Sequence, residues 1–285
     1  MNYATLKNFG IVVSIGLAAA GVLSGCGGTK AASSAASSGE QKVVKLGIMG
    51  ASDEKVWDPI KEDFKKKGVD IEYVFFSDYR QPNAALNNGE IDLNSFQHYT
   101  FLNNEIKKFG YDITPIGDTL LTSLNLYSKK IKDVKEIKDG DKIAVPNDLV
   151  NLGRALTVLQ AAGLIKLSPD AKTPPDTDDI VENPKHIELV QVDASQTASM
   201  LPDVAAAIIN GGFAIDAGLS PKDDSIFVDD PSYYKDKAYV NVIAVRTKDK
   251  DNPLYKEIVA DYQSDRTKDI FKNDFQGLYI PAWGK

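Results

Sequence analysis

The amino-acid sequence predicts an α/β protein built as two lobes with a ligand cleft between them. From Val43 onward, short runs rich in β-forming residues alternate with segments of helical periodicity, which is the pattern of α/β folds. The chain has 285 residues, about twice the ~150 of a single domain, so it is long enough for two lobes with a core each. Two long β-rich runs, one ending at Ser128 and one starting at Tyr239, are candidates for the crossings between the lobes.

The first part of the folded chain is expected to alternate strands with helices. Val56, Ile60 and Phe64 recur on one face of the first helix, and Gly68 is placed to end it. Strands are expected at Val43–Ile48, Asp70–Phe76 and Ile91–Phe96, and helices at Asp53–Lys67, Gln81–Asn88 and Thr100–Phe109.

The pattern restarts with one long β-rich run at Ile113–Ser128. Further strands are expected at Lys142–Val145, Ile187–Val192, Val204–Ile209 and Tyr239–Val245, and helices at Leu152–Ala162, Pro253–Tyr262 and Thr267–Phe275. If the last helices return to the first lobe, that lobe comprises residues 43–126 plus 243–285, and the second lobe comprises residues 127–242.

Residues 1–25 have the features of an export signal. Lys7 precedes fourteen mainly apolar residues at Gly10–Leu23, fewer than the ~20 that span a bilayer. The signal ends in Leu23-Ser24-Gly25-Cys26, which resembles the bacterial lipobox, where the cysteine thiol receives a diacylglyceryl group. The alternative is an ordinary signal peptide with an incidental cysteine. We expect lipidation at Cys26, followed by a flexible tether at residues 26–42, which are mostly Ala, Ser and Gly.

Composition excludes several classes of protein. Apolar residues make up 43% and charged residues 26%, as in soluble globular proteins and unlike disordered or polytopic membrane chains. Acidic residues outnumber basic ones 40 to 33, so the basic excess that binds nucleic acid is missing. Cleavage at Cys26 would make the chain more acidic still, so we expect membrane contact through the lipid anchor only.

The chain contains few residues of the types that enzymes use as nucleophiles, bases or metal ligands. Cys26 is the sole cysteine, and His98 and His186 are the only histidines. The GxSxG, GxxxxGK[ST], HExxH and GxGxxG motifs do not occur at places where they would carry chemistry. We therefore expect no enzyme, no cofactor and no metal site, although a Ser/His/Asp set assembled in space would overturn this expectation.

Arginine is rare in this chain, so each arginine is a candidate for a specific role. Arg154 follows a strand and a loop at the start of an expected helix, with Asn151 suited to be the N-cap residue. The guanidinium group grips a carboxylate through two hydrogen bonds, and a helix N-terminus favours an anion. We therefore predict that Arg154 binds a ligand carboxylate, with an exposed surface ion pair as the alternative.

Two loops that follow strands carry aromatic side chains. Tyr79, Phe96 and His98 lie in these loops, where α/β sheets place ligand-facing residues. Such a wall would suit an apolar or thioether side chain. Plain core packing of Phe96 and a purely structural role for His98 are the alternatives.

Many motifs together resemble the NlpA family of methionine-binding lipoproteins, in register over essentially the whole mature chain. They are the lipobox and tether, Asp78–Leu86, Gly89–Asp92, Phe96–His98, Leu126–Lys130, Val145–Asp148, Asn151–Leu156, Ala162–Leu167, Val181–Lys185, Ile209–Asn210, Asn241–Ile243 and Tyr262–Ser264. The resemblance implies a periplasmic-binding-protein-like fold. It also implies a monomeric, lipid-anchored protein on the extracytoplasmic side of the cell membrane, which passes methionine to the permease and ATPase subunits of an ABC importer.

The ligand that the resemblance implies is methionine, L or D, a closely related amino acid or a methionine-containing dipeptide. Family contacts carried over residue by residue fall on Tyr79, Phe96 and His98 for the side chain of the ligand, and on Arg154, Asn210 and Asn241 for its head group. The chain departs from the family pattern at Leu121–Asn125 and at Gly211–Phe213. A retained head-group site with a roomier side-chain pocket follows. The alternative function is a surface lipoprotein acting mainly as an adhesin.

Overall fold

The computed structural model of the chain describes residues 42–230, 237–275 and 277–284. The expected export signal, Cys26 and the tether up to residue 41 lie outside these ranges. Within the described ranges, no helix combines the length and the apolar character that crossing a membrane requires.

A six-stranded sheet contains both the first and the last strand of the described chain. β1 pairs in parallel with β2 and β3, whereas β12 runs antiparallel to β3 and β4, and β13 antiparallel to β4. In sheet order the strands are β13 (Tyr279–Pro281), β4 (Ile113–Thr122), β12 (Val240–Arg246), β3 (Leu93–His98), β1 (Lys42–Ile48) and β2 (Val69–Phe75). Its helices are α1 (Ala51–Lys66), α2 (Pro82–Asn88), α3 (Tyr99–Phe109), α6 (Pro253–Tyr262) and α7 (Asp265–Asp274).

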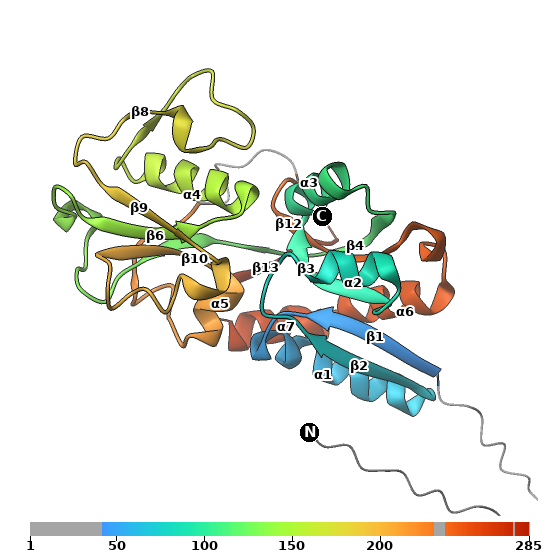
Figure 1. The fold of residues 1–285 in the computed structure, drawn as a ribbon. Coiled ribbons are helices and arrows are strands. Elements are labelled where there is room, and N and C mark those ends of the chain that lie inside the picture. Colours follow the sequence, from blue (N-terminus) through green and yellow to red (C-terminus); the bar gives the residue numbers. More distant parts are fainter. Residues whose placement is uncertain (1–41, 231–236, 276, 285) are drawn as a thin grey trace, which may run out of the picture. The chain divides into compact units, whose positions relative to one another are not determined.

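Different helices cover the two faces of this sheet. Ile243 and Val245 of β12 pack into one core cluster with α1, α6 and α7, whereas Val242 and Ala244 pack into another with α2 and α3. Successive strand residues point to opposite faces, so one strand supplies both cores. Figure 1 shows α1 and α2 on opposite sides of β1 and β2.

The second sheet has five strands and lies entirely within the middle of the chain. Its order is β11 (Ser225–Phe227), β5 (Leu124–Tyr127), β10 (Ala206–Asn210), β6 (Lys142–Pro146) and β9 (Glu188–Val192). Helix α4 (Leu149–Ala161) packs on one face, and α5 (Gly211–Asp216) contributes Ala214 to the core on the other. A small hairpin of β7 (Lys166–Leu167) and β8 (Ile180–Glu182) completes this part.

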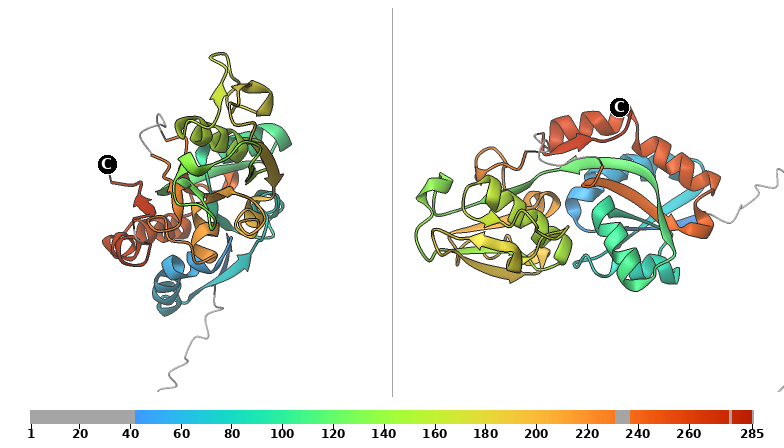
Figure 2. Two further views of the ribbon diagram at one scale, coloured as in Figure 1. Left: turned by 90° about the vertical axis from the view of Figure 1, so that its left-hand side faces the viewer. Right: turned by 90° about the horizontal axis from the view of Figure 1, so that it is seen from above.

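The chain passes from the first sheet to the second at Ser123, between β4 and β5, and returns between β11 and β12. Figure 2 shows β4 and β5, in green, continuing from one sheet into the other. Sheet membership therefore changes a few residues before the expected lobe bounds at 126/127 and 242/243. The expected crossing in the run Ile113–Ser128 is confirmed, because β4 pairs in the first sheet whereas Leu124 of β5 pairs with Asn210 of the second.

Most expected elements are present with small shifts of their ends, and α6 begins and ends as expected at Pro253–Tyr262. The start of α4 differs more. Its N-cap is Asp148, whose carboxylate accepts the backbone N–H of Asn151, so the helix begins at Leu149 and Asn151 is not the cap. Aspartate and asparagine are both good N-caps, and only the backbone geometry decides between them. The short elements α5, β7, β8, β11 and β13 were not expected.

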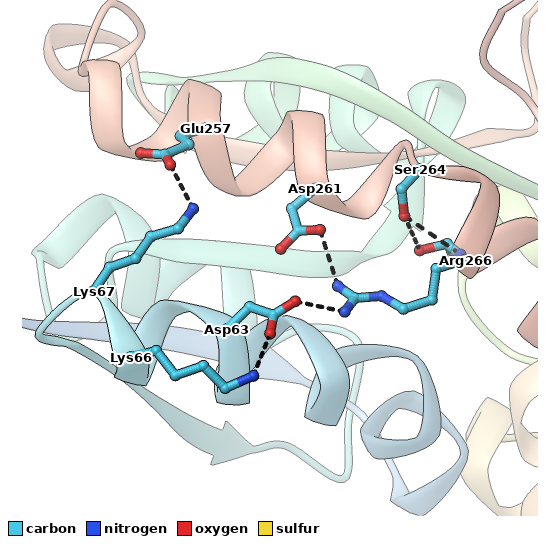
Figure 3. A network of polar contacts seen from close by, with 8 residues as sticks. Asp63, Lys66, Lys67, Glu257, Asp261, Ser264 and Arg266 are labelled. Atoms are coloured by element: carbon cyan, nitrogen blue, oxygen red, sulfur yellow. Dashed lines mark hydrogen bonds and ion pairs between the residues drawn. The ribbon is translucent and has the colours of Figure 1, made fainter.

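Ion pairs on the outer surface tie α1 to the C-terminal helices (Figure 3). The two terminal nitrogens of Arg266 contact Asp63 at 2.6 Å and Asp261 at 2.9 Å, and Lys67 contacts Glu257 at 2.6 Å. The C-terminal helices therefore do return to the sheet on which the folded chain begins.

Candidate functional site

A cavity of about 720 Å³, counted with the open space at its mouth, is lined by residues from both sheets and their helices. All six residues expected to contact a ligand line it: Tyr79, Phe96, His98, Arg154, Asn210 and Asn241. The fold thus brings together residues that are up to 162 positions apart in the chain. Their contact with a ligand stays a prediction.

Arg154 is buried at one side of this cavity and held by two acceptors. Its Nη2 donates to the backbone oxygen of Thr122 at 2.8 Å and to Oδ2 of Asp229 at 2.7 Å. The guanidinium carbon lies 4.6 Å from the ring centre of Tyr239, a cation–π geometry. The side chain is 3% exposed, so the alternative of an exposed surface pair is wrong.

The same Asp229 joins Arg154 to the start of β5. Its Oδ2 also accepts the backbone N–H of Leu124, and its own backbone N–H donates to Oδ1 of Asn125. Arg154 is therefore fixed against the place where the chain passes from one sheet to the other. Asp229 was not predicted, because nothing local distinguishes it from its neighbour Asp230.

Asn210 is oriented by a chain of polar contacts at the start of α4. The carboxylate of Asp148 accepts from Nδ2 of Asn151, whose Oδ1 accepts from Nδ2 of Asn210 at 3.0 Å. Burial is the main cause that raises the pKa of Asp148. Within the described part of the chain, Oδ1 of Asn210 is buried without a hydrogen-bond partner. Asn210 therefore presents an acceptor at the cavity.

His98 combines a structural role with a place at the cavity. Its Nδ1 accepts the backbone N–H of Phe101 and so caps α3, which assigns the ring proton to Nε2. Burial, with Arg154 as the second cause, lowers the pKa of His98 to about 3, so the ring is neutral at physiological pH. Among the described residues no acceptor lies within hydrogen-bond distance of Nε2, although the Asn151 side chain is near enough to raise the pKa slightly. The ring therefore offers the cavity one N–H donor.

The expected aromatic wall is present and larger than expected. The ring of Tyr79 lies 5.7 Å from that of Phe96, 6.0 Å from Phe101 and 5.1 Å from Phe213. Phe101 lines the cavity and was missed, because a phenylalanine in the first turn of a helix has the same local pattern as one in the core.

Gly211 and Gly212 both line the cavity, but they differ in the room beside them. A Cβ atom on Gly211 would come within 2.0 Å of Oγ1 of Thr122, whereas one on Gly212 would meet nothing nearer than the Tyr279 hydroxyl at 3.5 Å. A Cβ atom therefore fits in ordinary contact beside Gly212, whereas Thr122 fills the space beside Gly211. The roomier side-chain pocket stays a prediction.

The cavity also has a part that sequence analysis missed entirely. Met49, Asp53, Thr119, Leu120, Tyr262 and Tyr279 line it, from α1, β4, α6, β13 and the end of β1. One carboxylate oxygen of Asp53 accepts the backbone N–H of Met49 at 3.0 Å. Burial, and to a smaller extent the charge of Asp216, raise the pKa of Asp53 to about 6. In sequence terms Asp53 is indistinguishable from an ordinary acid in the first turn of a helix.

The family model described as NlpA lipoprotein matches residues 44–283. The chain belongs to the NlpA lipoprotein family. The D-methionine-binding lipoprotein MetQ of Salmonella typhi is 42% identical over 243 residues, which cover 84% of this chain and 88% of that protein.

Solved structures of similar proteins have the same fold. Protein PG110 from Staphylococcus aureus has a TM-score of 0.79 at 44% identity, covering 84% of this chain and 94% of the other. A nutrient-binding protein from Burkholderia cenocepacia bound to methionine has a TM-score of 0.79 at 40% identity, covering 84% and 100%. The expected periplasmic-binding-protein-like α/β class and the expected family are confirmed.

Proposed function

We propose that this chain is the lipid-anchored substrate-binding protein of an ABC importer, and that it binds methionine, L or D, a closely related amino acid or a methionine-containing dipeptide. The observation that carries the proposal is the cavity, which joins a buried arginine to an aromatic wall. The MetQ relative is named for binding D-methionine, and the Burkholderia cenocepacia structure holds methionine. The protein acts as a carrier and performs no chemical reaction.

Each predicted contact has a physical reason. The ligand carboxylate lies at Arg154, whose guanidinium group is a charged donor, and the N–H of His98 donates to the ligand. Asn210 and Asn241 each supply an amide that can both donate and accept. The thioether packs against Tyr79 and Phe96, because a polarisable sulfur makes favourable contacts with aromatic rings.

The proposed location is supported by the N-terminal sequence and by the family. The protein is anchored through a lipid on Cys26, faces the extracytoplasmic side, and passes its ligand as a monomer to the permease and ATPase subunits. In Cys26→Ser cells the protein should not be labelled by radioactive fatty acid. Labelling of the variant equal to that of the unchanged protein would contradict the lipid assignment.

An adhesin is disfavoured. That function predicts an exposed apolar patch and no polar cleft, whereas buried polar side chains here converge on one cavity.

The decisive experiment is to identify the ligand that the protein carries. Native mass spectrometry of protein purified from cells should show the added mass of methionine or of a methionine-containing dipeptide. After unfolding and refolding to strip the ligand, these compounds should raise the melting temperature, because binding to the folded state alone stabilises it. An unrelated solute that raises it while every methionine compound fails would overturn the proposal.

A further inference from the structure

Arg80 forms an ion pair between the two parts of the fold, each of which is built on one sheet. Arg80 follows β2 of the first sheet, whereas Asp193 follows β9 of the second. Nη2 of Arg80 lies 3.2 Å from Oδ2 of Asp193 and 3.3 Å from Oδ1. Neither residue lines the cavity, and their side chains are 62% and 33% exposed. The two parts are thus joined by a pair of charges that water reaches.

Asp78 fixes the orientation of the Arg80 guanidinium group. Its carboxylate accepts from Nε at 2.9 and 3.0 Å and from Nη2 at 2.5 Å, and it also accepts the backbone N–H of Arg80 at 2.9 Å. All of these contacts lie within one loop of the first part, so they do not depend on the position of the second part. A guanidinium group held in this way loses little side-chain freedom when it binds a second carboxylate.

Acidic side chains from both parts surround Arg80. Asp78 of the first part and Asp148 and Asp193 of the second line a small hollow together with Arg80. Arg80 is the only cation among the described residues that line this hollow. Without Arg80, the carboxylates of the two parts would repel each other across it. Arg80 therefore replaces a repulsion between the two parts by an attraction.

The ion pair follows the two edge strands that are most distant from the crossings between the sheets. The chain crosses from β4 to β5 and from β11 to β12. In the first sheet β3 and β1 stand between β12 and β2, and in the second β10 and β6 stand between β5 and β9. At about 4.8 Å per strand, each edge is roughly 14 Å from the nearest crossing strand. A contact at that distance opposes a hinge opening with a longer lever arm than a contact beside the crossings.

Tyr79, the neighbour of Arg80 in the chain, connects this ion pair to the ligand cavity. Tyr79 lines both the small hollow and the cavity. Its ring lies 5.1 Å from the ring of Phe213 in α5, which belongs to the second part. Separating the two parts on this side of the cavity breaks the Arg80–Asp193 pair and moves Tyr79 away from Phe213. The ion pair and the aromatic contact therefore hold the same side of the cavity closed.

We propose that the ion pair between Arg80 and Asp193 is a clasp that keeps the cavity closed over a bound ligand and so slows its release. The proposal goes beyond the proposed function and rests on it. Arg80 acts here as a positioning residue, because it does not contact the ligand. The clasp forms only after the two parts have come together, so it acts on the release rate and not on association. Because its charges are exposed, its effect is modest and sensitive to salt.

The test measures how fast bound methionine leaves the purified protein. Radioactive methionine is bound and then chased with an excess of unlabelled methionine at low salt. Arg80→Gln and Asp193→Asn should each speed release about three- to fivefold and leave the association rate within about twofold of that of the unchanged protein. In about 1 M NaCl, where charges act over only about 3 Å, the unchanged protein should release methionine as fast as Arg80→Gln.

A charge reversal separates the clasp from a merely structural role of Arg80. Arg80→Asp places a second carboxylate opposite Asp193 and should speed release at least about fivefold. Adding Asp193→Arg to the same chain should bring release back within about twofold of the unchanged protein, because the pair is restored with its charges exchanged. Arg266→Gln is the matched control. It removes an ion pair between elements that pack on one sheet, so the release rate should not change.

Two results would overturn the clasp and leave the proposed function in place. One is release from Arg80→Gln and Asp193→Asn at the rate of the unchanged protein. The other is an unchanged protein whose release rate does not rise with salt, because a clasp made of exposed charges must weaken under screening. Failure of every methionine compound to bind the unchanged protein would instead overturn the proposed function, and the clasp with it.

Discussion

Arg154 at the cavity and Arg266 on the outer face of α1 form ion pairs of nearly the same length in very different surroundings. Arg154 lies 2.7 Å from Asp229, and the two side chains are 3% and 0% exposed. Arg266 lies 2.6 Å from Asp63, and those side chains are 37% and 35% exposed (Figure 3). The distance alone therefore says little about how much such an ion pair contributes to stability, because water screens the outer pair and not the inner one.

The two arginines also connect different parts of the fold. Arg266 joins α7 to α1 and α6, all of which pack on the same sheet. Arg154 bonds to Thr122, at the end of β4, and to Asp229, shortly after β11. Both partners of Arg154 lie where the chain passes between the two sheets. The cavity therefore borders the segments that connect the sheets, whereas the Arg266 network joins helices that pack on a single sheet.

The largest effect is expected from Arg154→Ala. It leaves Asp229 buried without its cation, which should lower the free energy of unfolding by about 3–5 kcal/mol. Ligand binding should be lost, and Arg154→Lys should restore it only in part, because lysine lacks the fork of donors. Urea denaturation and calorimetry measure the two effects. Affinity within threefold of the unchanged protein would contradict the predicted carboxylate contact.

Asp53→Asn is expected to stabilise the ligand-free protein. The folded-state pKa of Asp53 is about 6, against an ordinary value of 3.8. Protonated Asp53 therefore contributes to the free energy of unfolding below pH 3.8, and this contribution is lost as the pH rises through 6. Removing the charge should raise the free energy of unfolding at pH 7.5 by about 2–3 kcal/mol.

The gain from Asp53→Asn should shrink toward zero as the pH falls to 4. Urea titrations at both pH values measure it. A variant less stable than the unchanged protein at pH 7.5 would show that the carboxylate mainly caps α1.

Gly211→Ala tests how tightly the cavity wall is packed. The new methyl group would meet Oγ1 of Thr122 at 2.0 Å, and such overpacking should cost about 1–3 kcal/mol of unfolding free energy. Gly212→Ala is the matched control, because its methyl group reaches only van der Waals distance from Tyr279. Equal melting temperatures for the two variants would show that Thr122 moves aside freely.

The smallest effect is expected from Arg266→Ala. Its pairs with Asp63 and Asp261 are partly exposed, so the free energy of unfolding should fall by at most about 1 kcal/mol, and less at high salt. Ligand affinity should not change. If this variant lost as much stability as Arg154→Ala, exposure would not be what separates the two arginines.

The sequence by itself determined the order of helices and strands and the six residues that meet at the cavity. Hydrophobic periodicity and helix-ending glycines are local signals, so α6 was predicted with its exact bounds. The six cavity residues were found because rare arginine, aromatic residues after strands and the family motifs can all be seen without knowing which segments touch.

Only the tertiary structure decided which charges meet. Asp229 is 75 residues from Arg154, and Asp53 and Asp216 come together from α1 and α5, so no local pattern links them. The break at Ser123 is equally hidden, because alternation continues from β4 into β5 and only the choice of pairing strand separates them. Periodicity records which face of an element is buried, whereas burial of a charge and its partner depend on contacts between distant segments.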